Sequence, residues 1–358
     1  MTANTARPLR PEAALGRIAV FRALQLGDML CASPALRALR AAHPRARITL
    51  IGLPWAREFA ERFSHYLDDF IAFPGAPGLP ERTATPAEHA EFVARARAAD
   101  FDFVLQLHGS GRHSNAVVAS IGARDCAGFH PRGESVPERE RFFAYPEGEP
   151  EVRRLLRLLE FLGVPLRGDA LDFPIAPAEW RAAAAARARF GLQPGYYACV
   201  HPGARAATRR WPPERFARVA DRLAAKGLRV VVTGTAEEGV LAAAIAKSMH
   251  APCVDLTGQT SVGVLAALLT GAKLLVCNDT GVSHIAAALR VPSVVIYLGS
   301  SPERWAPLDR ERHRAVFRAV DCRPCEHTVC PIGHPCATGV THEEVMREVD
   351  SLLERRVG

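Results

Sequence analysis

The sequence predicts an α/β protein made of two doubly wound domains. Strand and helix signals alternate along almost the whole chain, and the strands are short, continuous apolar runs, as in parallel sheets that are covered on both faces. A stretch rich in proline and glycine at 163–177 interrupts this alternation and fits an interdomain linker. At 358 residues the chain is too long for one small core and fits two domains of ~150–180 residues.

In the first half, apolar runs predict strands and apolar residues at helical spacing predict helices. The expected strands are 18–21, 48–53, 70–73 and 103–107, and the expected helices are 28–42, 55–63, 87–99 and 151–162. Residues 132–150, which mix acidic and basic side chains, are expected to be a surface excursion.

The second half repeats the alternation without an internal sequence repeat. The expected strands are 196–200, 228–233, 253–256, 274–277 and 293–298, and the expected helices are 178–190, one starting near Pro213, one ending at Met249, 262–269, and 342–355. Two doubly wound domains facing one cleft are the simplest assembly of such a chain.

Composition narrows the class of protein. Hydrophobic residues make up 48% and charged residues 23%, as in soluble globular proteins, and no apolar run is long enough for a transmembrane helix. The N-terminus lacks the apolar core of a signal peptide, so we expect a cytoplasmic protein. The net charge of +7 is spread along the chain. This positive charge is consistent with an anionic substrate or with an acidic membrane surface, or it reflects only the frequent use of arginine by a GC-rich genome. We expect no nucleic-acid partner.

The most informative stretch runs from Leu274 to Leu289, where an apolar run, a polar turn and helical spacing follow one another. In such a turn the free N–H groups and the dipole of the helix attract an anion, and Gly281 lets a phosphate approach the backbone. Asp279, Thr280, Gly281 and His284 are the candidate residues. The alternative is a structural turn with Asp279 or Thr280 as N-cap and His284 as a packed histidine.

Gly27 and Asp28 follow the first predicted strand, where open parallel sheets bind their ligands. Asp28 is a candidate for chemistry there, and an N-cap aspartate is the alternative. In the second half, Gly203 and Arg209 follow a strand in a pattern that suits a diphosphate, or else form an exposed basic loop. Glu237 follows the next strand and could accept ribose hydroxyls, or it is a first-turn acid of a helix.

Near the C-terminus, Cys322, Cys325, Cys330 and Cys336 have the spacing Cys-X2-Cys-X4-Cys-X5-Cys. Thiolates at this density can bind a structural zinc or iron ion. Packed reduced thiols and adventitious oxidation are the alternatives.

These segments together resemble glycosyltransferase family 9, the ADP-heptose:lipopolysaccharide heptosyltransferases, over nearly the whole chain. The matching segments are Leu26-Gly27-Asp28 with Arg22 before it, His201-Pro202-Gly203-Ala204, Arg209–Pro212 and Asp279–Leu289. The resemblance implies the GT-B architecture, with two doubly wound Rossmann-like domains facing a central cleft. Residues 1–170 would bind the acceptor, 171–340 the nucleotide sugar, and 341–358 would form a helix returning toward the first domain.

The resemblance also implies roles for residues. Asp28 would be the general base, and the motif from Asp279 to His284 would hold the diphosphate. Arg209 stands where the family usually has lysine, so its planar fork replaces a point charge. No paired Asp-X-Asp motif occurs in a suitable strand-end loop, and we therefore predict catalysis that requires no metal or other cofactor.

The leading hypothesis is an inverting transfer of heptose from ADP-heptose to an anionic glycolipid acceptor, Kdo-lipid A or the inner core of lipopolysaccharide. It implies peripheral contact with the cytoplasmic face of the inner membrane. Alternatives are a family 9 enzyme with another acceptor, such as a protein or another glycan, or another sugar-nucleotide donor. A non-catalytic sugar-nucleotide-binding protein is disfavoured because Asp28 is present, and a nicotinamide oxidoreductase because no Gly-X-Gly-X-X-Gly follows the first strand.

Overall fold

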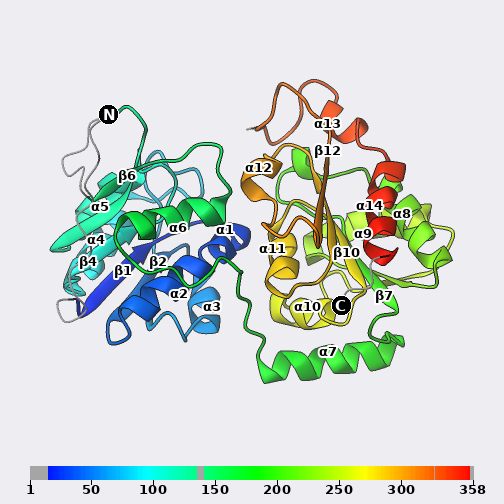
Figure 1. Ribbon diagram of the computed structural model, residues 1–358, viewed down its shortest axis with the longest axis horizontal. Helices are drawn as coiled ribbons and strands as arrows, with labels where there is room; N and C mark the ends of the chain where they lie inside the picture. The colour runs from blue at the N-terminus through cyan, green and yellow to red at the C-terminus, as the bar shows by residue number, and fades with distance from the viewer. Residues whose placement is uncertain (1–14, 135–140, 326, 355–358) are drawn as a thin grey trace. The chain divides into compact units, whose positions relative to one another are not determined.

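The computed structural model describes residues 15–134, 141–325 and 327–354, and the chain divides into two compact units between Leu171 and Asp172. Each unit contains one six-stranded sheet with helices packed on it (Figure 1). All strand pairs in both sheets are parallel. This is the doubly wound α/β class that the sequence predicts.

The elements of the first unit follow one another as strands and covering helices. They are β1 (Arg17–Phe21), α1 (Leu26–Cys31), α2 (Ser33–Ala42), β2 (Arg47–Gly52), α3 (Ala56–Arg62), β3 (Asp69–Ala72), α4 (Pro86–Ala98), β4 (Phe103–Gln106), α5 (Ser114–Ile121), β5 (Asp125–His130), β6 (Phe142–Ala144) and α6 (Glu151–Phe161).

The second unit has the same alternation with additional short helices. Its elements are α7 (Pro177–Phe190), β7 (Tyr197–His201), η2 (Ala207–Arg209), α8 (Pro213–Ala225), β8 (Arg229–Val232), η3 (Ala236–Glu238), α9 (Gly239–Ser248), β9 (Cys253–Asp255), α10 (Val262–Leu269), β10 (Leu274–Asn278), α11 (Gly281–Ala288), β11 (Ser293–Tyr297), α12 (Pro302–Trp305), β12 (His313–Phe317), α13 (Pro335–Thr338) and α14 (His342–Glu354).

The two sheets have the same topology. Their strand orders are β3-β2-β1-β4-β5-β6 and β12-β11-β10-β7-β8-β9. Counted within its own unit, each order is 3-2-1-4-5-6, so the winding reverses between β1 and β4 in the first sheet and between β7 and β10 in the second. Such switch points, at the carboxyl ends of the strands, are where doubly wound sheets bind ligands.

In each unit a hydrophobic core fills the space between the sheet and the helices that cover it. All five residues of β10 are buried, and so are all five of β7, because helices cover both faces of the sheet. The core of the second unit includes Trp211, Phe216 and the buried face of α14, which packs against α8. The final helix is therefore part of the second unit, and Arg355, the last residue of the predicted helix, lies outside the described residues.

The sequence-based boundaries differ from the structure in specific places. The predicted helix 28–42 is two helices, because Pro34 can occupy only the first turn of a helix and a new one begins at Ser33. The stretch 132–150 is not only a surface excursion, since β6 within it extends the sheet. In the described part of the chain, no helix is long and apolar enough to cross a membrane.

Candidate functional site

Asp28 lies at the switch point of the first sheet, as the sequence predicts. Helix α1 begins four residues after β1 ends, with Gly27 as its second residue and Asp28 as its third. The N-cap of this helix is Gln25, so the alternative that Asp28 is an N-cap aspartate does not hold. Its side chain is only half-buried. A carboxylate in this place can reach a ligand above the end of β1.

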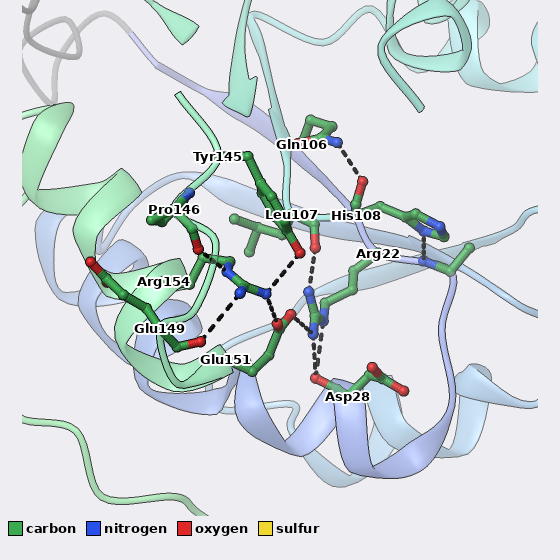
Figure 2. Close-up of polar contacts among 11 residues, drawn as sticks. Arg22, Asp28, Gln106, Leu107, His108, Tyr145, Pro146, Glu149, Glu151 and Arg154 are labelled. Atoms are coloured by element: carbon green, nitrogen blue, oxygen red, sulfur yellow. Dashed lines mark hydrogen bonds and ion pairs between the residues drawn. The ribbon is translucent and has the colours of Figure 1, made fainter. Parts of the chain in front are cut away.

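The backbone of Asp28 is held by a buried arginine (Figure 2). Arg22, 1% exposed, donates from Nε and Nη2 to the carbonyl oxygen of Asp28 at 3.0 and 2.8 Å. The same guanidinium donates to the carbonyl oxygen of Leu107, just after β4, and forms an ion pair with Glu151 Oε1 at 3.0 Å. Arg22 therefore ties the ends of β1 and β4 to helices α1 and α6.

A second buried arginine completes this network. Arg154 donates from Nη1 to Glu151 Oε2 and to the hydroxyl of Tyr145, both at 2.7 Å, and from Nε to the carbonyl oxygen of Pro146 at 2.9 Å (Figure 2). Glu151 thus bridges two guanidinium groups, and all three charged residues are at most 2% exposed. Buried ions are costly unless each has partners of this kind. We call Arg22, Glu151 and Arg154 the buried ion network.

His108 lies close to Arg22 and is a titratable residue that the sequence did not single out. Its Nδ1 accepts from the backbone N–H of Ala23 at 3.2 Å, so the neutral ring carries its proton on Nε2, which lies 3.8 Å from Glu81 Oε2. Burial, aided by the charge of Arg22, lowers the pKa of His108 to about 4. The ring is therefore neutral at physiological pH. Its position directly after β4 is the only sequence signal for it.

The predicted strand, turn and helix around Asp279 are present. Strand β10 ends at Asn278, Thr280 is the extended N-cap, and α11 begins at Gly281. Asp279 is 5% exposed, and burial raises the pKa of its carboxyl group. The hydroxyl of Ser300 and the charge of Arg209 oppose this rise in pKa. The structure therefore places Asp279 in a buried turn between β10 and α11.

Asn278 joins the motif segments of the second unit. Its side chain is fully buried, and Oδ1 accepts from the backbone N–H of Trp211 at 3.1 Å. Its Nδ2 donates to the carbonyl oxygen of Pro202 at 2.6 Å. Segments 201–204, 209–212 and 278–284 therefore meet at the switch point between β7 and β10.

Within the helix that follows, the polar side chains have different roles. His284, 4% exposed, occupies the fourth position of α11, with its ring 6.5 Å from that of Trp305. The hydroxyl of Ser283 donates to the carbonyl oxygen of Thr280 at 2.8 Å, so this donor serves the turn itself. The N-cap Thr280 makes no capping bond with its side chain.

The glutamate beside Gly203 is Glu238 rather than Glu237. Glu237 is exposed in the middle of η3, whereas the carboxylate of Glu238 lies against Gly203, where any side chain would overlap it. Glu238 also accepts from the backbone N–H of Thr235 at 2.8 Å. Burial lowers the pKa of His201, next to Gly203, and the charge of Glu238 opposes this. The absence of a side chain at Gly203 thus makes room for Glu238.

The late cysteines surround one small cavity. Cys322, Cys325, Cys330 and Cys336 line it together with His334, and all of them are free thiols. Among the described residues, however, no three His, Cys, Asp or Glu side chains are gathered so that they could hold a metal ion. The arrangement seen here therefore does not by itself provide a metal site.

Comparison with known proteins gives the family. The model of glycosyltransferase family 9 (heptosyltransferase) matches residues 90–335, more than half of the chain. Lipopolysaccharide heptosyltransferase 2 of Escherichia coli (strain K12) is 26% identical over 364 residues, which cover 94% of this chain and 98% of that protein.

Solved structures share the fold. A family 9 glycosyltransferase from Veillonella parvula has a TM-score of 0.80 at 22% identity, with 97% of this chain and 99% of that chain covered. The E. coli ADP-heptose lipopolysaccharide heptosyltransferase II has a TM-score of 0.71 at 22% identity, with 95% and 98% covered. These likenesses confirm the predicted GT-B fold class. The sequence match confirms the family as well: the chain belongs to glycosyltransferase family 9, the heptosyltransferases, and is a glycosyltransferase.

Proposed function

We propose that this glycosyltransferase transfers heptose from ADP-heptose to the inner core of lipopolysaccharide, with inversion at the anomeric carbon. The observation that supports the proposal is the meeting of three motif segments around Asn278 at the switch point of the second sheet, to which we assign the binding of the diphosphate. The substrates are those named for the relatives, which include lipopolysaccharide heptosyltransferase 2 and the ADP-heptose lipopolysaccharide heptosyltransferase II of E. coli.

In the proposed reaction Asp28 is the general base. Its carboxylate takes the proton from an acceptor hydroxyl while the hydroxyl oxygen attacks the anomeric carbon, on the face opposite the departing diphosphate. Asp28 precedes the residues that the family model matches, so its role rests on its position and on the resemblance of its segment. Arg22 supports the role, because it fixes the backbone from which the carboxylate projects.

The leaving ADP gains negative charge as the bond to the sugar breaks. We assign its stabilisation to the guanidinium of Arg209, the N–H groups at the start of α11 from Thr280 to Val282, and His284. For the ribose hydroxyls we propose Glu238 in place of Glu237, because only Glu238 reaches the turn that contains Gly203.

The acceptor in this proposal is Kdo-lipid A or the inner core, an anionic glycolipid. The net charge of +7 favours such a molecule. The protein would meet it at the cytoplasmic face of the inner membrane through peripheral contact. No divalent metal takes part in the proposed transfer, since Arg209 and α11 neutralise the diphosphate. The domain roles follow: residues 1–170 bind the acceptor and 171–340 the donor.

A structural zinc or iron ion at Cys322, Cys325, Cys330 and Cys336 is a separate proposal. The spacing and the shared cavity support it, whereas the thiols are not gathered as ligands. Metal analysis of the purified, reduced protein tests it, and about one equivalent of zinc or iron is the expected result. A metal content near zero would contradict it.

The decisive experiment compares nucleotides and then one variant. By calorimetric titration the protein should bind ADP at micromolar concentration and more tightly than GDP or UDP, and it should transfer heptose from ADP-heptose in the presence of EDTA. Preference for another nucleotide would replace the donor, and dependence on a divalent metal would contradict the proposed leaving-group stabilisation.

The variant Asp28→Asn tests the base. It removes the proton acceptor but keeps the shape of the side chain. Transfer should therefore fall by roughly 1000-fold, within the range of about 10²–10⁴ that general acid–base catalysis contributes. ADP affinity should be unchanged, because the donor segments lie in the other unit. Transfer within a few-fold of the unaltered protein would show that Asp28 is not the base.

A further inference from the structure

The segment of residues 318–336 that contains the cysteines, here called the cysteine loop, has no part in the function proposed so far. Its cavity is lined by the four thiols and His334, and also by Thr208 and Gly299. These last two residues come from other segments. The loop is therefore packed against the parts of the chain that contain them.

One set of contacts fixes the end of strand β11. Arg323 donates from Nε to the carbonyl oxygen of Leu298 at 2.9 Å and from Nη2 to that of Tyr297 at 3.1 Å. The backbone N–H of Cys325 donates to the carbonyl oxygen of Gly299 at 2.7 Å. A methyl group at Gly299 would come within 3.1 Å of Cys325 Cβ, so the two backbones are in close contact. Consecutive carbonyl groups of one strand end are thus bound by the loop.

A second set of contacts fixes Thr208. Its hydroxyl donates to the carbonyl oxygen of His327 at 2.7 Å, and its N–H to that of Thr328 at 3.4 Å. The ring of His334 donates from Nε2 to the carbonyl oxygen of Thr208 at 2.9 Å. Every hydrogen-bonding group of Thr208 is therefore bonded to the loop, and Thr208 is only 3% exposed.

The residues that directly follow these two anchor points belong to the proposed donor site. Arg209 follows Thr208, and Ser300 follows Gly299. Two residues after Arg209, the backbone N–H of Trp211 donates to Oδ1 of Asn278, the residue before Asp279, at 3.1 Å. The cysteine loop thus holds one end of the short segment 208–211, whose other end is bonded next to Asp279.

We propose that the cysteine loop is a positioning element of the donor site, and that His334 is the positioning residue through which it sets Arg209 against the diphosphate. The inference rests on the proposed function in that the ligand is a nucleoside diphosphate. The thiols that surround the shared cavity pack between the two anchor points, Thr208 and Gly299, and keep them at a fixed separation with or without a metal ion.

The test uses the full chain and ADP. His334 has a left-handed backbone, φ 60° and ψ 50°, which asparagine tolerates best among residues other than glycine. The variant His334→Asn should therefore keep the fold, while its shorter side chain cannot reach Thr208. Its ADP dissociation constant should rise roughly tenfold, as the loss of ~1.4 kcal/mol would produce. The KM for the donor should rise in parallel, whereas that for the acceptor should not change.

Two further variants complete the design. Thr208→Val removes the hydroxyl that bonds to His327 and should weaken ADP binding in the same direction. Val329→Ser alters a loop residue that is 73% exposed, and it should bind ADP like the unaltered protein. The midpoint of thermal unfolding is recorded for each variant, so that a loss of fold is distinguished from a loss of position.

The outcomes separate this inference from the proposed function. Unchanged ADP affinity in both folded variants, His334→Asn and Thr208→Val, would overturn the inference and leave the proposed function intact. Failure of the unaltered protein to bind any nucleoside diphosphate would overturn both. Equal weakening by Val329→Ser would show that the loop matters only for general stability, and would also overturn the inference.

Discussion

Asp279 is a residue at which function opposes stability. Its carboxyl group is 5% exposed, and the rise in its pKa shows that the cost of burial exceeds what Ser300 and Arg209 return. For an acid with a raised pKa in the folded state, the protonated form is favoured by folding. Its raised pKa therefore lowers the free energy of unfolding at pH values above the pKa that the acid has in the unfolded chain.

Replacing this acid should stabilise the protein in a pH-dependent way. Asp279→Asn should raise the unfolding midpoint at pH 8, and a gain of ~1 kcal/mol would correspond to roughly 2–4 °C for a unit of this size. The gain should shrink as the pH falls toward 4, because Asp279 then becomes protonated in the unaltered protein. Thermal scans across this pH range measure it, and a destabilised variant at pH 8 would contradict the argument. Asp255→Asn, which changes an exposed acid of the same unit, is the control.

Some site residues could be predicted from the sequence and others could not. Asp279 directly follows strand β10, and Asp28 lies in the first turn of the helix after β1, so the local pattern places both near strand ends. Which of Glu237 and Glu238 points toward Gly203 depends on the single turn of η3, and no local sequence pattern determines the orientation of that turn. Asn278 is visible in the sequence only as the last residue of a strand, and its bonds to Trp211 and Pro202 depend on the order of strands in the sheet.

Helix α6 acts on helix α1 although the two are far apart in the chain. Glu151, the first residue of α6, bonds to Arg22, which is 129 residues away. Because Arg22 in turn holds the backbone of Asp28, the position of the proposed base depends on α6. This dependence predicts that a single charge on α6 affects transfer.

The variant Glu151→Gln tests this dependence. The amide keeps the volume but removes the charge between Arg22 and Arg154, and breaking such a buried pair costs ~3–5 kcal/mol. In the fraction that remains folded, transfer should fall at least tenfold while ADP affinity is unchanged. The control is Glu147→Gln, an exposed glutamate of the preceding loop, which should behave like the unaltered protein. A folded Glu151→Gln protein with normal transfer would show that the buried ion network serves stability alone.

Among the secondary-structure elements, strands could be predicted from the sequence wherever apolar residues dominate. Strands β1, β2, β4, β7, β10 and β11 are apolar runs and were predicted as strands. Strand β5 contains Gly128, whose missing side chain makes room for Gln106, and its pattern is therefore interrupted. Strand β12 lies at the edge of its sheet and begins with His313 and Arg314, so its composition is that of a loop.

The stability of the whole molecule should depend on two buried histidines, one in each unit. Burial lowers the pKa of His108 and of His313 to about 4. In the unfolded chain a histidine has a pKa of about 6.5, so it binds a proton there before it does so in the fold. The stabilisation is complete above pH 6.5 and is lost as the pH falls toward 4.

At pH 5 each of these histidines should cost ~2 kcal/mol of stability relative to pH 7.5. In His108→Asn and His313→Asn the amide can replace the bonds of Nδ1 to Ala23 and Ser293, but it does not titrate. Each variant should therefore lose less stability than the unaltered protein between pH 7.5 and 5, in chemical unfolding experiments. A variant that loses as much stability as the unaltered protein over this pH range would contradict the assignment to that histidine.

The identical strand order of the two sheets has a consequence for how such a chain can diverge. In each half the sheet and its covering helices fix the backbone, whereas the loops at one edge carry the polar groups. Insertions or substitutions in the loops of one half leave the strand register of the other half untouched. With the proposed division of acceptor and donor between the two units, specificity for one reactant can therefore drift over evolutionary time, or be exchanged by recombination at the linker, while specificity for the other reactant is inherited unaltered.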